Sequence, residues 1–142
     1  VVMIINLTRK RCISRIPVIA DSFLIRTRGM IGRDFTDFDA MIFNRCNSIH
    51  TMFMKIALDV LFIDRNNAVC GMRRGLQPWH PLVRVGGAWA VIELPSGAID
   101  QSGTELGDLV DLNAELDRDT VTAMGSKEII NPIGTAISYK RE

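Results

Sequence analysis

Residues 58–72 read LDVLFIDRNNAVCGM and decide the class of fold. Two short apolar runs, 58–64 and 68–72, meet at the polar tetrapeptide Asp64-Arg65-Asn66-Asn67. Because Asn tolerates the left-handed backbone that tight connections need, this stretch predicts a β-hairpin.

The same rhythm runs along the chain, with short apolar segments about ten residues apart and turn signals between them. This spacing is typical of a β-sandwich or barrel. We therefore predict strands over residues 1–7, 12–19, 40–43, 49–54, 58–64, 68–72, 88–94, 108–112, 120–124 and 135–139. Pro95-Ser96-Gly97 and Ser102-Gly103 are expected to break the chain after the strand at 88–94.

One segment, residues 21–32, has helical spacing instead. Asp21 is a plausible N-cap, and Gly32 is well placed to end the helix. The residues that share one face at this spacing are Phe23, Leu24, Thr27, Met30 and Ile31. The predicted fold is therefore mainly β (α+β) with one short α-helix near residues 21–32.

Size and composition indicate a single globular domain over residues 1–142. The chain has 142 residues, of which 47% are hydrophobic and 23% charged, and a chain of this length buries a sufficient core without disulfides. No apolar run approaches a membrane span, so no membrane partner is expected. The opening VVMII is too short for a signal peptide, which favours a cytoplasmic location with reduced, structural thiols at Cys12, Cys46 and Cys70.

Charge is distributed unevenly although the net charge is only +1. Residues 1–33 carry seven bases against one acid, and residues 75–142 carry five bases against ten acids. Such asymmetry fits either a basic patch for an acidic partner or pairing of the two ends within the fold. No aromatic residues interleave with the bases at 9–15, so nucleic acid is not expected as a partner.

Ionisable residues within apolar segments are the best candidates for chemistry. Asp59 lies in the strand at 58–64, where alternation places it on the side of Leu61 and Ile63. Glu93 lies among apolar neighbours at 88–94. A buried carboxylate must be paired or protonated, so each is either a tuned acid or base or a structural partner of an arginine.

His50, with Thr51 beside it, is a candidate base, ligand or core residue. Trp79 is a candidate pocket wall or core residue. Neither His50 and His80 nor the three cysteines have a spacing that suits zinc, and no phosphate loop, dinucleotide fingerprint or nucleophile elbow is present. We therefore predict no metal and no cofactor.

Several segments together resemble the domain-of-unknown-function 192 family, a group of small bacterial and archaeal proteins. The matching pieces are RTRGMIGR at 26–33, AMIF at 40–43, SIHTMFMK at 48–55, LDVLFID at 58–64, LQPW at 76–79, VIELPSG at 91–97 and LGD at 106–108. The chain departs from the family pattern at Phe53, Ala57 and His80. The resemblance covers residues 8–112 and leaves residues 113–142 as a C-terminal extension.

The resemblance implies a β-sandwich of jelly-roll type with one short helix and no established activity. Three functions stay open: a binding or accessory domain for a small ligand or protein segment, a small enzyme using a His50–carboxylate acid/base pair, or a protein-interaction subunit, monomeric or homodimeric. The candidate ligand-site residues are Arg28, Arg33, His50, Thr51, Asp59, Trp79 and Glu93.

Overall fold

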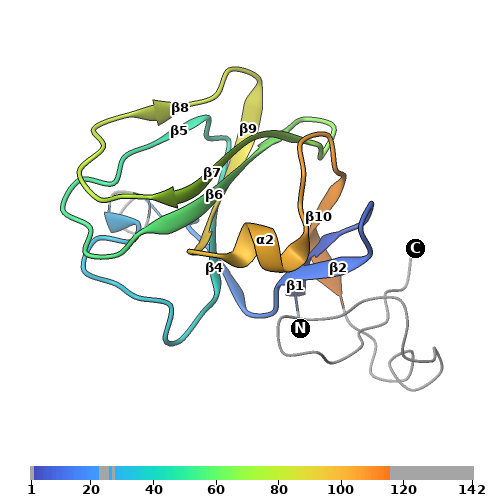
Figure 1. Cartoon of the computed structure of the whole chain (residues 1–142), viewed down its shortest axis with the longest axis horizontal. Helices are drawn as coiled ribbons and strands as arrows, with labels where there is room; N and C mark the ends of the chain where they lie inside the picture. The colour runs from blue at the N-terminus through green and yellow to red at the C-terminus, as the bar shows by residue number, and fades with distance from the viewer. Residues whose placement is uncertain (1, 23–25, 27, 116–142) are drawn as a thin grey trace.

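The computed structural model describes residues 2–22, 26 and 28–115 of the chain (Figure 1). Its elements in chain order are β1 (Val2–Asn6), β2 (Arg11–Ser14), β3 (Pro17–Ile19), β4 (Ala40–Asn44), β5 (Ser48–Ile49), β6 (Leu58–Asp64), β7 (Val69–Leu76), β8 (Val83–Arg84), β9 (Ala88–Pro95), α2 (Ala98–Ser102) and β10 (Val110–Glu115). The prediction of a mainly β fold is confirmed.

The described strands form a layered arrangement of sheets (Figure 1). The largest has the order β3-β4-β9-β6-β7, with β3 and β4 parallel and the other neighbours antiparallel. A second sheet has the order β10-β1-β2, and β5 pairs with β8 in a two-stranded ribbon. The hairpin predicted from residues 58–72 is present as β6 and β7.

The five-stranded sheet buries both of its faces. Its inner face, which carries Leu61, Ile63 and Ile92, packs against residues of the three-stranded sheet and α2. Those packing partners are Ile4, Ile13, Ile99 and Val110. The opposite face, here called the cavity face, carries Val60, Phe62 and Val91 and is covered by side chains from residues 30–54: Met30, Phe38, Ile49 and Met54.

The alternation predicted for β6 is confirmed, since Leu61 and Ile63 lie in one core cluster and Val60 and Phe62 in the other. Burial of each of these side chains contributes about 1.5–3 kcal/mol to folding. A strand that is apolar on both faces is expected where the sheet lies between two layers.

The single strand predicted over 12–19 is wrong. The chain breaks between β2 and β3, which belong to different sheets. The Asp39 carboxylate stabilises this break by accepting hydrogen bonds from the Arg15 and Ile16 amides, at 2.8 and 3.0 Å. The sequence pattern does not show that the chain passes from one sheet to the other here, because the strands on both sides of the break are hydrophobic.

The strand predicted over 49–54 is also wrong beyond Ile49. Phe53 has a left-handed backbone with φ of 63°, and the Thr51 amide donates to the carbonyl oxygen of His80 at 2.8 Å. The segment therefore turns to contact a second loop instead of continuing in a sheet.

The residues after β9, which the sequence predicts to be turns, contain the short helix α2. Gly97, at φ of 97°, is the N-cap of α2, and Gly103, at φ of 64°, ends it. Only glycine adopts such a backbone readily, so these two glycines enclose a single short helix.

The predicted helix near 21–32 lies partly outside the described residues, which exclude Phe23, Leu24, Ile25 and Thr27. Arg26 and Arg28 are helical, and the Arg26 amide donates to the Ser22 carbonyl at 2.9 Å. Helical backbone ends before Gly29, at φ of 50°, and not at Gly32 as predicted. The strands predicted at 120–124 and 135–139 also lie outside the described residues.

Candidate functional site

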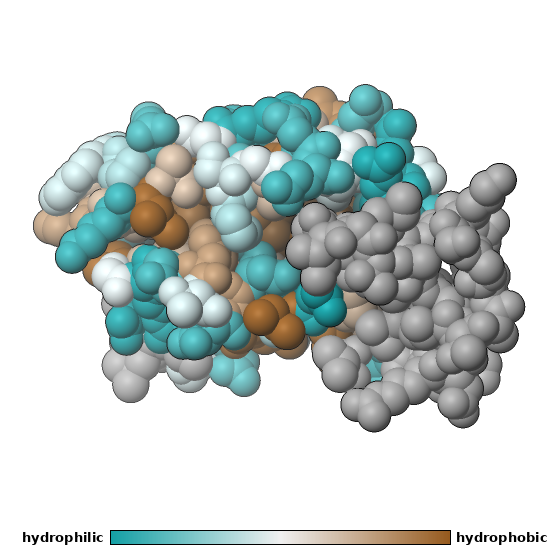
Figure 2. Space-filling model, turned by 60° about the horizontal axis from the view of Figure 1, so that its bottom comes forward, coloured by the Kyte–Doolittle hydropathy of each residue, from teal (hydrophilic) through white to brown (hydrophobic). Residues whose placement is uncertain are grey.

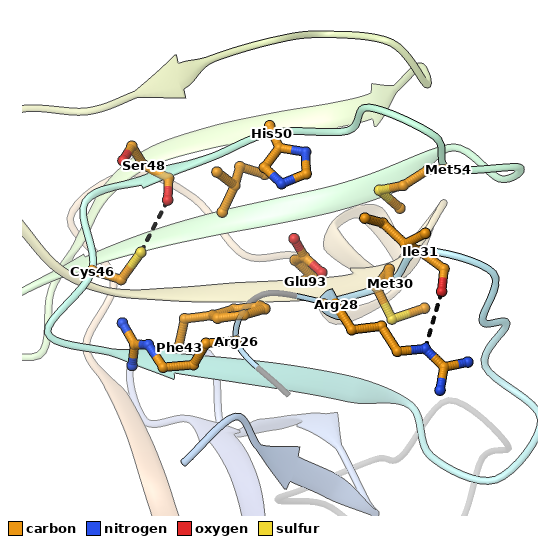
Figure 3. A pocket seen from close by; sticks show the side chains of 12 residues that line it. Arg26, Arg28, Met30, Ile31, Phe43, Cys46, Ser48, His50, Met54 and Glu93 are labelled. Carbon is orange, nitrogen blue, oxygen red and sulfur yellow. Dashed lines mark hydrogen bonds between the residues drawn. The ribbon is translucent and has the colours of Figure 1, made fainter. Parts of the chain in front are cut away.

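A cavity of about 130 Å³ lies over the cavity face of the five-stranded sheet (Figure 3). Strands β4 and β9 form its base, and residues 26, 28–31 and 46–54 form its sides. Its lining residues are Arg26, Arg28, Gly29, Met30, Ile31, Phe43, Cys46, Ser48, Ile49, His50, Met54 and Glu93.

Glu93 lies at the base of this cavity. Its side chain projects from β9 toward the space between the two walls (Figure 3), yet the residue is only 3% exposed. Its Oε2 atom is completely buried and has no hydrogen-bond partner within the described residues. Burial raises the pKa of Glu93 to about 8, because a low-dielectric environment disfavours the charged form. At neutral pH the group is therefore mostly a carboxylic acid that can donate a hydrogen bond.

The walls around Glu93 are apolar. Met30, Phe43, Ile49 and Met54 are all buried, and all four belong to the core cluster on the cavity face. Such walls strengthen any polar interaction made at the base, since they exclude water.

Basic and imidazole groups surround the mouth. The Arg26 Nη1 donates to the carbonyl oxygen of Asn44 at 2.8 Å, and the Arg28 Nε donates to that of Ile31 at 3.3 Å (Figure 3). His50 is exposed, and its Nδ1 accepts a hydrogen bond from the Met52 amide at 3.2 Å. In a neutral ring this acceptor role places the proton on Nε2.

Three of the seven predicted site residues come together here: Arg28, His50 and Glu93. Asp59 does not, because it lies on the inner face of the sheet. Its Oδ1 accepts the Gly75 amide at 2.9 Å, while its Oδ2 accepts the amides of Gly97 at 3.1 Å and Ile99 at 2.9 Å. Asp59 thus caps α2 from the neighbouring strand β6, and its partners are backbone amides and not the helix arginines proposed from sequence.

Thr51 is fully buried and joins two loops. Its Oγ1 donates to the Gln77 carbonyl at 2.8 Å and accepts the His80 amide at 2.9 Å. The Trp79 amide donates to the Thr51 carbonyl at 2.8 Å. These bonds hold the loops around residues 51 and 79 together.

Trp79 and Arg33 lie away from the cavity lining. Trp79 is 59% exposed and packs edge-on against Phe53, with ring centroids 5.0 Å apart.

The space-filling view shows hydrophobic residues as an interrupted band among hydrophilic ones on one face of the molecule (Figure 2).

Sequence reasoning missed how the cavity is enclosed. Cys46, Ser48 and Ile49 line the cavity from a segment that the sequence predicts to be strand only from residue 49 onward, and the sequence predicts no more for Phe43 than a place in a strand. The Cys46 thiol donates to the Ser48 carbonyl at 2.9 Å, which holds this segment in a turn. Within the described part of the chain, no three His, Cys, Asp or Glu side chains are arranged to hold a metal ion.

The sequence matches the domain-of-unknown-function 192 (DUF192) family, described as "Uncharacterized ACR", over residues 7–112. The chain belongs to the DUF192 family. A UPF0127 protein from Thermococcus sibiricus is 35% identical over 138 residues, covering 93% of this chain and 87% of that protein.

Two solved structures share the fold. A protein of unknown function from Novosphingobium aromaticivorans has a TM-score of 0.60 at 22% identity and covers 67% of this chain and 73% of its own. A candidate transcription regulator from Sinorhizobium meliloti has a TM-score of 0.63 at 19% identity and covers 78% of this chain and 90% of its own. At these identities the likeness concerns the DUF192 fold and not an activity.

All residues that line the cavity lie inside the DUF192 span. All of them except Cys46 lie within the segments that carry the sequence resemblance. Across the described residues, no helix of this DUF192 protein is long and apolar enough to cross a membrane.

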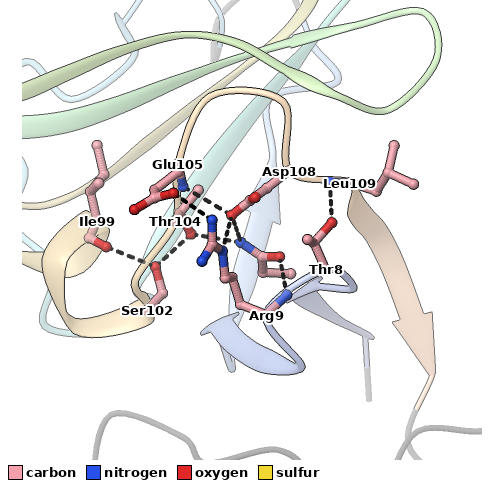
Figure 4. A network of polar contacts seen from close by, with 9 residues as sticks. Thr8, Arg9, Ile99, Ser102, Thr104, Glu105, Asp108 and Leu109 are labelled. Carbon is pink, nitrogen blue, oxygen red and sulfur yellow. Dashed lines mark hydrogen bonds and ion pairs between the residues drawn. The ribbon is translucent and has the colours of Figure 1, made fainter.

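A polar network joins the two ends of the DUF192 span (Figure 4). The Asp108 Oδ2 accepts hydrogen bonds from Asn6 Nδ2 at 2.9 Å, Arg9 Nε at 3.0 Å and the Glu105 amide at 2.9 Å. Burial acts to raise the pKa of Asp108, but the hydrogen bonds from Arg9, Asn6 and Glu105 outweigh it, and the pKa lies below its usual value. Arg9 also pairs with Glu105. Arg9, one of the basic residues in 1–33, is therefore paired within the fold with two of the acidic residues in 75–142, Glu105 and Asp108.

Proposed function

We propose that this protein is a binding module for a small molecule, and that its site is the cavity that ends at Glu93. The observation that carries the proposal is that Glu93 lines the cavity while its buried Oε2 lacks a hydrogen-bond partner in the described structure.

A buried polar atom without a hydrogen bond costs about 1–3 kcal/mol. Natural folds avoid this cost, so a buried polar atom without a partner calls for an explanation such as a functional role or a bound group that supplies the missing partner. Asp59 illustrates the ordinary alternative in the same sheet, since its carboxylate accepts three backbone amides. Glu93 can recognise a ligand because none of its described neighbours forms a hydrogen bond with its Oε2 atom.

The size of the cavity sets the size of the ligand. An apolar cavity of about 150 Å³ holds a benzene molecule. A volume of about 130 Å³ therefore suits a ligand of roughly six heavy atoms, or the end of a longer one that extends through the mouth.

Binding accounts for the arrangement better than acid/base catalysis by His50. No hydrogen bond joins His50 to a carboxylate among the described residues, and the His50 Nδ1 is already used by the Met52 amide. In the neutral ring the other nitrogen, Nε2, carries the proton, so neither nitrogen has a free lone pair with which to act as a general base.

The experiment uses methionine-methyl NMR, because Met30 and Met54 line the cavity and Met3 lies in a separate core cluster. Acids, amides, amines and alcohols of four to eight heavy atoms are added one at a time. Binding in the cavity shifts the methyl signals of Met30 and Met54 and leaves that of Met3 in place.

Two variants complete the test. Glu93→Leu removes the polar group at the base and is expected to abolish the shifts, whereas Glu105→Gln, a change at an exposed acid, is expected to retain them. If no compound moves Met30 or Met54, the proposal is wrong.

A further inference from the structure

We infer that the ligand of this cavity is a short-chain monocarboxylate, whose carboxylate accepts a hydrogen bond from Glu93 at the base while its hydrocarbon chain contacts the methionines. The inference rests on the proposed binding function and adds the chemical class of the ligand.

The first argument is the charge of the lining. The titratable or charged groups that face the cavity are Arg26 and Arg28 from the segment 26–31, Cys46 and His50 from the segment 46–54, and Glu93 from β9. Glu93 is the only acid among these described residues. With Glu93 in its acid form, Arg26 and Arg28 are charged without a counter-charge from the other lining residues. Their guanidinium groups lie at the rim of the cavity, where each donates to a backbone carbonyl, so the field at the mouth favours an anion.

The second argument is the kind of group at the base. A carboxylic acid in a dry site donates a hydrogen bond through its O–H group, and a hydrogen bond to an ionised acceptor is about twice as strong as one to a neutral acceptor. Two carboxyl groups that share one proton are a known arrangement in protein sites. The free ligand supplies the carboxylate, and Glu93 supplies the proton.

The third argument concerns donors at the mouth. Among the described residues, the Arg28 side chain donates one hydrogen bond, through Nε, and the Arg26 side chain donates one, through Nη1. Each guanidinium has five N–H donors, so both retain donors for an anion that enters between them. An ammonium ligand would have to pass these two charges and would require ionised Glu93.

The walls define the rest of the ligand. Met30, Phe43, Ile49 and Met54 offer apolar contacts, and methionine adapts to chains of varied shape. A four-carbon acid such as n-butyrate has a suitable size for about 130 Å³.

The test compares three probes of equal length: n-butyrate, n-butyramide and n-butylammonium. Each is titrated at pH 7.0 and pH 9.5, with the Met30 and Met54 methyl signals as the readout. At pH 7.0 we expect n-butyrate to bind at least about tenfold more tightly than n-butyramide and n-butylammonium to cause no shift. Ionisation of Glu93 should weaken n-butyrate binding by about thirtyfold at pH 9.5.

Variants assign the pH effect to one group. Glu93→Gln keeps an N–H donor at the base, so it should still bind n-butyrate but lose the pH dependence. His50→Gln and Cys46→Ser each replace one of the other side chains of the lining that can gain or lose a proton, and each should keep the thirtyfold effect. Thermal unfolding of every variant is measured first to establish that it folds.

The outcomes separate the two proposals. If n-butylammonium binds as tightly as n-butyrate, or n-butyramide binds equally well, the carboxylate assignment is wrong while binding in the cavity stands. If none of the three binds but another compound of the screen moves Met30 and Met54, the same conclusion holds. If no compound moves these methyl groups, both proposals fail.

Discussion

Asp59 and Glu93 lie on adjacent antiparallel strands but point to opposite faces of the five-stranded sheet. Asp59 pairs with Leu94 and Glu93 pairs with Val60, so the two acids are one position out of register. Since side chains alternate across a sheet, this single step places Asp59 against α2 and Glu93 against the cavity. The two acids that look alike in the sequence therefore have separate roles.

Glu93 is expected to make the protein less stable as the pH rises. The folded protein keeps the Glu93 proton up to a pH of about 8, whereas the unfolded chain releases it near the ordinary pKa of 4.5. Between these values the unfolded state binds fewer protons, so the free energy of unfolding falls as pH rises. The stabilisation is complete below pH 4.5 and is lost by about pH 8, with a total change of roughly 3–5 kcal/mol.

Urea unfolding at pH 4.5, 6, 7 and 8.5 measures this effect in the wild type and in Glu93→Gln. Because the amide does not ionise, the stability of the variant relative to wild type should increase steadily over this range. A difference that stays constant with pH would show that Glu93 ionises equally in both states.

Asp59→Asn is expected to lower stability without changing the cavity. The amide cannot accept all three backbone N–H groups that the carboxylate accepts, so the variant should lose about 1–3 kcal/mol. The methyl signals of Met30 and Met54 should keep their positions and their response to ligand. Asp100→Asn is the matched control, because Asp100 is exposed and its pair with Arg74 contributes little. A loss of ligand response in Asp59→Asn at full stability would contradict the structural role.

Thr51→Val is expected to loosen the two loops that Thr51 joins. Valine has nearly the same shape but leaves the Gln77 carbonyl and the His80 amide without their partner, at a cost of about 1–3 kcal/mol. Hydrogen exchange of the His80 amide should become faster in Thr51→Val and remain slow in Thr51→Ser, which keeps the hydroxyl. Equal exchange in the two variants would mean that the hydroxyl does not hold the loop.

Asp108→Asn is expected to reduce resistance to acid. The pKa of Asp108 is lower in the folded protein than its usual value of 3.8, so its contribution is present above that value and is lost as the pH falls through the folded pKa. Acid unfolding followed by circular dichroism should begin at a higher pH in the variant, and its stability at pH 7 should fall by about 2–4 kcal/mol. Glu105→Gln removes only the exposed partner of Arg9 and should change both quantities little. An unchanged acid midpoint in Asp108→Asn would contradict this account.

Strands of the central sheet could be predicted because each depends on the spacing of apolar residues within one short stretch of sequence. The hairpin of β6 and β7 and the alternation of β6 follow from apolar spacing and Asn-rich turn chemistry alone. The break between β2 and β3 could not be predicted from spacing, since it depends on Asp39, which is remote from Arg15 and Ile16 in the sequence. The helix α2 was missed because its flanking glycines were interpreted as turn residues.

The candidate site could be predicted only in part, because it also depends on contacts between segments that are distant in the sequence. Burial of Glu93 follows from its apolar neighbours, but whether it has a partner depends on contacts between distant segments. Asp59 has a similar sequence environment, and only the register of β6 and β9 distinguishes the two acids. Arg28 and His50 reach the same cavity through non-strand segments whose course no periodicity indicates.

The most direct test is a carbon-13 NMR titration of the Glu93 carboxyl group, in the protein alone and saturated with n-butyrate. The signal is assigned by its absence in Glu93→Gln. We predict a pKa of about 8 in the free protein and a higher one with n-butyrate, because a ligand that accepts a hydrogen bond from the protonated Glu93 carboxyl group favours the protonated form. A free pKa near 4.5 that n-butyrate leaves unchanged would contradict the account.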